Sequence, residues 1–292
     1  MSLESAKYEC LNLNSIKIHT VSMGSDNNKT PILLLHGFPE FHYSYRYLMP
    51  LLARDRKVVA IDQRGYHKSS KPKRVKNYRL EYLMSDVVGV IKKISNSKKV
   101  ILVGHDWGGA VAWHVARCYP KHVEKLIILN CPPADLLFNA MTKIPRQLLM
   151  SYYIFLFQLP LIPERLFRLS NFKMLRIMQK SIKTERGRVS KEEIEEYIRC
   201  FNRPRGLSGI NYYRAAFRDA MRGRLDPKRK VQCPTLVLWG TKDFALHTNL
   251  TLYFKEYVHQ KKDLRIKYFK DVGHFTPEEI PTKIAEEILD FV

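Results

Sequence analysis

The 292-residue sequence contains no apolar run long enough to span a bilayer. Its longest apolar-rich segment, residues 147–163, is interrupted by prolines and polar residues. Residues 1–10 lack the apolar run that follows a basic start in a signal peptide. These absences favour a cytoplasmic location.

Cysteine is scarce, and its spacing matches neither a disulfide scaffold nor a metal site. The five cysteines are odd in number, widely separated and without a Cys-x-x-Cys pair; they are Cys10, Cys118, Cys131, Cys200 and Cys233. This pattern is typical of reduced thiols in a cytosolic protein. We therefore expect no metal site.

Acidic residues are outnumbered by basic ones, with 28 Asp and Glu against 50 Lys and Arg, which gives a net charge of +22. Basic runs occupy residues 71–76 and 228–230. No aromatic RNA-binding signature or zinc-finger spacing accompanies them, so we expect no nucleic-acid partner. The charge is typical of a solvated face and would also permit peripheral contact with an anionic membrane.

The sequence also lacks any Gly-x-Ser-x-Gly segment, which argues against a serine esterase. In its place stands Gly-His-Asp-Trp-Gly at residues 104–108, between the apolar run 100–103 and a helical pattern from Ala110 onward. This order predicts a strand, a sharp turn and a helix, with Asp106 at the turn. A carboxylate there suits displacement at saturated carbon, which leaves an alkyl ester on the enzyme. The alternative is that Asp106 only caps the helix.

Short apolar runs alternate with helical segments and predict a mainly parallel α/β sheet. Strands are expected at residues 8–13, 16–23, 31–35, 57–61, 100–103, 123–129, 235–239 and 264–268, and helices at 80–93 and 110–119. The first two strands should form an antiparallel edge. Residues 131–225 show no buried-strand pattern, so we expect an all-helical cap inserted into a core of residues 1–130 and 226–292.

The segments Gly-His-Asp-Trp-Gly-Gly at 104–109 and His-Gly-Phe-Pro-Glu at 36–40 resemble those of epoxide hydrolases of the α/β-hydrolase fold. The resemblance covers nearly the whole chain and lies closest to the animal branch, some of whose members carry an N-terminal membrane anchor. It implies an eight-stranded, mainly parallel sheet with helices on both faces, a helical cap and no cofactor. Membrane association is the alternative location if such an anchor precedes this segment.

Candidate partners of Asp106 occur later in the chain. Asp243 and His274 each follow a predicted strand, at the carboxyl end where parallel sheets place their chemistry. The order nucleophile, acid, base is that of the α/β-hydrolase triad. We therefore predict that Asp243 orients His274 and that His274 deprotonates water. The backbone N–H groups of Phe38 and Trp107 are expected to stabilise the oxyanion.

The predicted cap holds tyrosines suited to opening an epoxide ring. Residues 151–160 and 209–214 resemble the two cap segments in which the family keeps its ring-opening tyrosines. Matching by position selects Tyr153 and Tyr213 for this role. A phenol O–H placed there would stabilise the alkoxide that forms as the ring opens.

Each of these tyrosines has a tyrosine neighbour, Tyr152 or Tyr212, so a shift by one residue would exchange the roles. The other aromatic residues of the cap indicate a small hydrophobic epoxide, with fatty-acid epoxides among the candidates. We predict that Tyr152, Phe155 and Tyr212 contact the substrate. The sequence leaves the oligomeric state open.

Residues 62–67, Asp-Gln-Arg-Gly-Tyr-His, resemble a turn that supports the site in this family. The family's second glycine is replaced here by His67. We interpret Asp62 and Arg64 as structural, because an Asp-Arg pair at a glycine turn more often fixes a loop than takes part in catalysis.

Two other functions are weighed against this one. Haloalkane and haloacid dehalogenases share the carboxylate elbow and triad, but haloalkane enzymes usually differ at the position of Phe38. The elbow of fluoroacetate dehalogenases resembles His-Asp-Arg, whereas in this chain Trp107 follows Asp106. A catalytically silent hydrolase fold used for binding usually loses a triad member, and none is missing here. The sequence therefore favours an epoxide hydrolase with a covalent Asp106 ester.

Overall fold

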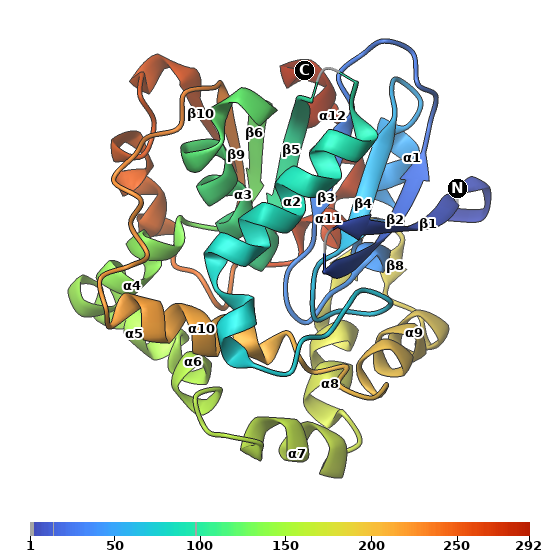
Figure 1. Ribbon diagram of the computed structural model, residues 1–292. Coiled ribbons are helices and arrows are strands. Elements are labelled where there is room, and N and C mark those ends of the chain that lie inside the picture. The colour runs from blue at the N-terminus through green and yellow to red at the C-terminus, as the bar shows by residue number, and fades with distance from the viewer. Residues whose placement is uncertain (1–2, 14, 97) are drawn as a thin grey trace.

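The computed structural model of the chain describes residues 3–13, 15–96 and 98–292. They form an eight-stranded sheet in the order β1, β2, β4, β3, β5, β6, β9, β10 (Figure 1). The strands are β1 (Lys7–Leu13), β2 (Ile16–Met23), β3 (Ile32–Leu35), β4 (Val58–Asp62), β5 (Val100–His105), β6 (Val123–Leu129), β9 (Thr235–Gly240) and β10 (Leu264–Phe269). Strand β2 pairs antiparallel with β1 and β4, and the other neighbouring pairs are parallel. The predicted mainly parallel sheet with an antiparallel edge is confirmed.

Helices cover both faces of this sheet. On one face, α2 (Leu80–Ile94) and α3 (Trp107–Cys118) share a core with Leu102 of β5. On the other face, α1 (Leu48–Leu52) and α12 (Pro281–Phe291) share a core with the flanking residues of β5. Alternate residues of one strand thus enter opposite cores, as the pleat requires. This is why β5 begins as a continuous apolar run.

The cap lies between β6 and β9 and gathers at one end of the sheet (Figure 1). Its helices are α4 (Ala134–Lys143), α5 (Pro145–Met150), α6 (Tyr152–Leu156), α7 (Ile162–Leu169), α8 (Lys173–Ser181), α9 (Lys191–Phe201) and α10 (Ile210–Ala220). A hairpin of β7 (Lys183–Thr184) and β8 (Gly187–Arg188) separates α8 from α9. Gly187 has a φ of 111°, a conformation that favours glycine and closes this tight turn. The cap therefore differs from the all-helical expectation at this hairpin.

Short helical turns join the larger elements. They are η1 (Leu3–Ser5), η2 (His42–Tyr45), η3 (Val75–Tyr78), η4 (Pro120–His122), η5 (Thr248–Glu256), η6 (Lys261–Asp263) and the helix α11 (Thr276–Glu279). Across the described residues, no helix combines the length and the apolarity needed to cross a bilayer.

Candidate active site

Asp106 lies on a sharp turn between β5 and α3, where its backbone has φ 46° and ψ −123°. A non-glycine residue at positive φ is strained, and such strain clusters at functional sites. Glycines make the close packing around it possible. A Cβ at Gly104 would lie 2.4 Å from the carbonyl oxygen of Gly108, and one at Gly108 would lie 1.9 Å from that of Leu35. The turn matches the predicted strand, elbow and helix, although α3 begins at Trp107, before the expected Ala110.

The loop after β3 reaches the Asp106 carboxylate. The backbone N–H of Phe38 donates to Asp106 Oδ1 at 2.8 Å. A Cβ at Gly37 would lie 2.4 Å from the Cβ of Asp106, so only glycine fits this approach. Trp107 is the first residue of α3, and its N–H therefore has no carbonyl partner within the helix. The loop after β3 and the start of α3 thus hold the two N–H groups predicted to form an oxyanion hole, both next to Asp106.

His274 and Asp243 meet at the carboxyl ends of β9 and β10. The Nδ1 of His274 donates to Asp243 Oδ2 at 2.7 Å, and its Nε2 lies 3.7 Å from Asp106 Oδ2. Both partners are buried, with Asp243 8% exposed and His274 3% exposed. The structure therefore brings the three predicted triad residues together in the expected order.

The electrostatics of this trio set its resting charges. Burial disfavours a charged His274, but Asp243 and Asp106 outweigh burial and raise the pKa of His274 well above its ordinary value. Burial also disfavours ionised Asp106, yet His274 and the Phe38 N–H hold the pKa of Asp106 below its ordinary value. The resting site therefore holds ionised Asp106 opposite protonated His274.

Asn130 supports the acid, and the sequence reasoning missed it. The amide nitrogen of Asn130 donates to Asp243 Oδ2 at 2.7 Å, and Asn130 Oδ1 accepts from the N–H of Gly240 at 2.9 Å. The N–H groups of Ala245 and Leu246 donate to Asp243 Oδ1 at 2.8 and 2.9 Å. Asp243 is thus fixed in place. The signal was available, since Asn130 directly follows the predicted strand 123–129.

A buried ion pair beneath the elbow was also missed, although both residues belong to quoted motifs. His105 Nδ1 contacts Glu40 Oε2 at 2.8 Å, and His105 Nε2 contacts the carbonyl oxygen of His274 at 2.8 Å. Both partners are acceptors, so both ring nitrogens carry protons. Burial opposes this charge, but Glu40 outweighs it and raises the pKa of His105. Glu40 also accepts from the N–H of Gly37 at 2.8 Å, so the pair ties the Phe38 loop to the backbone of His274.

Tyr153 of α6 and Tyr213 of α10 lie together over the elbow. Their ring centroids are 5.7 Å apart, and the ring of Tyr213 lies 5.0 Å from Trp107 and 5.7 Å from Phe38. Burial and the Asp106 charge raise the phenol pKa of each tyrosine well above its ordinary value. Both groups therefore keep their protons and can donate hydrogen bonds at neutral pH.

The three residues predicted to contact the substrate have different surroundings. Tyr212 is buried, and its hydroxyl donates to the carbonyl oxygen of Arg64 at 2.9 Å. Tyr152 is 65% exposed, and Phe155 is 45% exposed. Adjacent helical residues lie about 100° apart around the helix axis, so the two tyrosines of each pair point in different directions. Contact of Tyr152, Phe155 and Tyr212 with the substrate therefore stays a prediction.

Phe157, which the sequence reasoning did not single out, packs against the tyrosine pair. Its ring lies 5.0 Å from Tyr213, 5.8 Å from Tyr153 and 5.7 Å from Phe38, and the residue is 7% exposed. Aromatic side chains therefore surround the rings of Tyr153 and Tyr213.

The sheet, the carboxylate elbow and the acid and base at later strand ends are the features of an α/β hydrolase. A family model described as alpha/beta hydrolase fold matches residues 30–280. The chain is 36% identical to human "Epoxide hydrolase 4" over 285 residues, covering 96% of this chain and 76% of that protein. It is 35% identical to mouse "Epoxide hydrolase 3", covering 96% and 74%.

Solved structures agree with these relatives. A mutant epoxide hydrolase from Bacillus megaterium superposes with a TM-score of 0.86 at 27% identity, covering 97% of this chain and 99% of that one. The chain belongs to the epoxide hydrolases of the α/β-hydrolase fold, enzymes that hydrolyse the ether bond of an oxirane.

Proposed function

We propose that this chain converts an epoxide to a vicinal diol through an ester formed on Asp106. The observation that carries the proposal is the position of the Asp106 carboxylate, held by the Phe38 N–H, opposite His274 and close to Trp107, against which Tyr213 packs. An ionised carboxylate can attack carbon, and a phenol can receive the displaced oxygen.

In the first step, an Asp106 oxygen forms a bond to an oxirane carbon as the ring C–O bond breaks. The electron pair moves to the ring oxygen, which accepts hydrogen bonds from Tyr153 and Tyr213 and takes up a proton. Esterification removes the negative charge of Asp106, which is one of the two charges that raise the pKa of His274. His274 then loses its proton, which balances the proton gained by the alkoxide.

In the second step, neutral His274 accepts a proton from water as the water oxygen attacks the ester carbonyl. The N–H groups of Phe38 and Trp107 would stabilise the tetrahedral oxyanion. The intermediate releases the diol and restores ionised Asp106 opposite protonated His274. Asp243 keeps the imidazole oriented throughout.

The fate of the water oxygen tests this route. In a single turnover in heavy-oxygen water, the label should enter the Asp106 carboxylate and be absent from the first diol, because water attacks the ester carbonyl and not the epoxide. Mass spectrometry of the diol and of the Asp106 peptide measures both. Label in the first diol would contradict the covalent route.

Substitution by Phe should distinguish the roles of Tyr153 and Tyr213 from that of the neighbouring Tyr212. Tyr153→Phe and Tyr213→Phe should each slow ester formation by about 10-fold to 1,000-fold, because one donor to the ring oxygen is lost. Tyr212→Phe is the matched control, since its hydroxyl donates to Arg64 and not toward Asp106. Rapid-quench measurement of ester formation gives the rates. A loss in Tyr212→Phe equal to that in Tyr213→Phe would contradict the assignment.

We propose a small hydrophobic epoxide as the substrate, with fatty-acid epoxides as the first to test. Phe38 and Trp107 on the core and Phe157 on the cap surround the tyrosine pair with apolar rings. A panel of lipid and aryl epoxides would rank these classes by kcat/KM. Release of chloride from haloalkanes without turnover of any epoxide would favour a dehalogenase instead.

We also propose that the outer surface of the cap makes peripheral contact with an anionic membrane. Apolar side chains on residues 149–177 are more than half exposed; they are Leu149, Tyr152, Leu161, Leu166, Leu169, Met174 and Ile177. Exposed basic residues accompany them, namely Arg146, Arg165, Arg168, Lys173 and Lys180. Figure 1 places α7 and α8 at the end of the molecule away from the sheet. Apolar and basic side chains together suit an anionic lipid surface.

Binding to lipid vesicles tests this contact. The chain should sediment with vesicles containing phosphatidylserine and much less with pure phosphatidylcholine, and salt should weaken binding. The double variant Leu161→Ser/Leu169→Ser should reduce binding about tenfold or more. Leu252→Ser is the control, because Leu252 is 71% exposed but lies on η5. Equal binding by both variants would contradict the proposal.

A further inference from the structure

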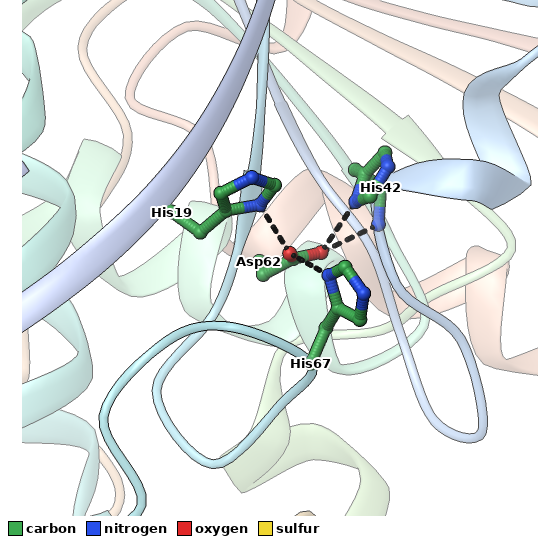
Figure 2. Close-up of side chains that lie close together, drawn as sticks. All are labelled: His19, His42, Asp62 and His67. Atoms are coloured by element: carbon green, nitrogen blue, oxygen red, sulfur yellow. Dashed lines mark hydrogen bonds and ion pairs between the residues drawn. The ribbon is translucent and has the colours of Figure 1, made fainter. Parts of the chain in front are cut away.

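Three histidines converge on one buried carboxylate outside the site described above. His19 on β2, His42 on η2 and His67 after β4 surround Asp62 at the end of β4 (Figure 2). The Nδ1 atoms lie 2.6 Å (His19), 2.9 Å (His42) and 2.8 Å (His67) from the Asp62 oxygens. All four residues are at most 7% exposed. This cluster joins three segments that are far apart in the sequence.

The arrangement is more than a loop needs for its own support. A single histidine donor would orient Asp62, whereas three imidazoles present their Nδ1 atoms to the same carboxylate (Figure 2). Burying imidazoles has a desolvation cost, and the Nε2 of His19 is buried without a hydrogen-bond partner. Three imidazole nitrogens and a carboxylate gathered in one buried cluster are a ligand set that transition metals take.

We propose that His19, His42, His67 and Asp62 bind a divalent transition metal, with zinc the best match. One ligand atom from each residue lies within 4.8 Å of the others. Zinc takes four nitrogen and oxygen ligands at about 2.0–2.2 Å, which separates neighbouring ligand atoms by about 3.3 Å. The observed contacts of 2.6–2.9 Å to Asp62 are shorter, so the rings would move outward by about half an ångström on binding.

The surroundings suit a structural ion. The ring of Tyr8 lies 6.0 Å from those of His19 and His42, and Tyr8 is 48% exposed, so the cluster lies close to the protein surface. The Nζ of Lys71 contacts the carbonyl oxygen of His67, and the Nζ of Lys68 lies 6.0 Å from the Tyr8 ring. The positive charges of Lys68 and Lys71 repel a metal cation. We therefore expect the metal to be held by its four ligands, and not by a negative charge on the surrounding surface.

The cluster is connected to the loop that holds Phe38, although it has no part in the chemistry proposed above. The residue after Asp62 is Gln63, whose backbone N–H donates to His36 Nε2 at 3.1 Å and whose side-chain nitrogen donates to His36 O at 2.6 Å. A bound metal would therefore brace β2, β4 and this loop against one another. The main effect expected is on stability, because an ion that binds the native state raises the free energy of unfolding.

Zinc titration of the chelator-treated 292-residue chain tests the proposal. Calorimetry and elemental analysis should give one zinc per chain, and zinc should raise the Tm, whereas magnesium and calcium should do neither because they prefer oxygen ligands. Cobalt substituted for zinc should give the intense visible absorption of a four-coordinate site. Activity is not needed for these measurements, so they stand whatever the epoxide assays show.

Two ligand variants and one control sharpen the test. His67→Gly should fold, because His67 has a φ of 37°, which favours glycine, and it should weaken zinc binding by more than about 100-fold. His42→Phe keeps a ring packed on Phe41 while removing another ligand. His259→Gln changes an exposed histidine outside the cluster and should bind zinc as the parent does. Absence of zinc binding, or equal binding by His67→Gly and the parent, would overturn the proposal.

Discussion

Asp106→Asn and Asp106→Ala should each lose epoxide turnover by at least about 10⁴-fold in kcat, because no other group can form the ester. The Asn variant is the more informative, since its amide oxygen can still accept from the Phe38 N–H and its shape is that of Asp. The Ala variant removes the side chain at a residue whose φ is 46°. Steady-state assays on the best epoxide of the panel measure the loss.

Circular dichroism and Tm separate lost chemistry from lost fold in these variants. Gly37 approaches the Cβ of Asp106 closely, so both variants preserve the contact that packs the elbow. Retained turnover in a folded Asp106→Asn protein would exclude Asp106 as the nucleophile. A parent protein that binds epoxides but never turns them over would instead favour the silent binding fold.

The sheet and the elbow could be predicted because their signals are local. Strand β3 is entirely buried and is a continuous apolar run, and such a run is recognisable in the sequence alone. The elbow is equally local, since Gly104 and Gly108 leave no room for a Cβ. The triad followed from topology, because carboxyl ends of parallel strands meet at one edge.

The direction of side chains within the cap could not be predicted in the same way. Helix α6 has five residues, too few to define which side faces the core, and Tyr152 and Tyr153 are equally aromatic. Only the packed structure distinguishes them, with Tyr153 against Tyr213 and Tyr152 65% exposed. The same ambiguity between Tyr212 and Tyr213 disappears once the hydroxyl of Tyr212 is seen to bond Arg64.

The histidine cluster was missed for a different reason. His19, His42 and His67 lie on three segments separated by 20 or more residues, and each alone is an ordinary buried histidine. The expectation of no metal site rested on cysteine spacing, which says nothing of imidazole ligands. The departure of His67 from the family's glycine was visible, but its meaning depended on which side chains the fold would bring to Asp62.

His274→Gln should separate the two halves of the reaction. Gln cannot accept a proton from water, so the ester should form and then persist, and kcat should fall by about 10³-fold to 10⁴-fold. Ester formation should slow much less, because Asp106 keeps the Phe38 N–H and the positive charge of His105 nearby. Intact-protein mass spectrometry after mixing with epoxide should show one added molecule of substrate per chain.

The double variant Asp106→Asn/His274→Gln provides the control, because the adduct requires the Asp106 carboxylate and should be absent from it. Peptide mapping of His274→Gln should place the added mass on the segment containing Asp106. If His274→Gln loses turnover without accumulating an adduct, then His274 is needed before the ester forms, and its role as the base of the second step is wrong. If the adduct forms and hydrolyses at the parental rate, another group must activate the water. We expect neither of these two outcomes. In the resting ion pair the Asp106 charge helps to keep His274 protonated, so the imidazole can act as a base only after the ester has removed that charge.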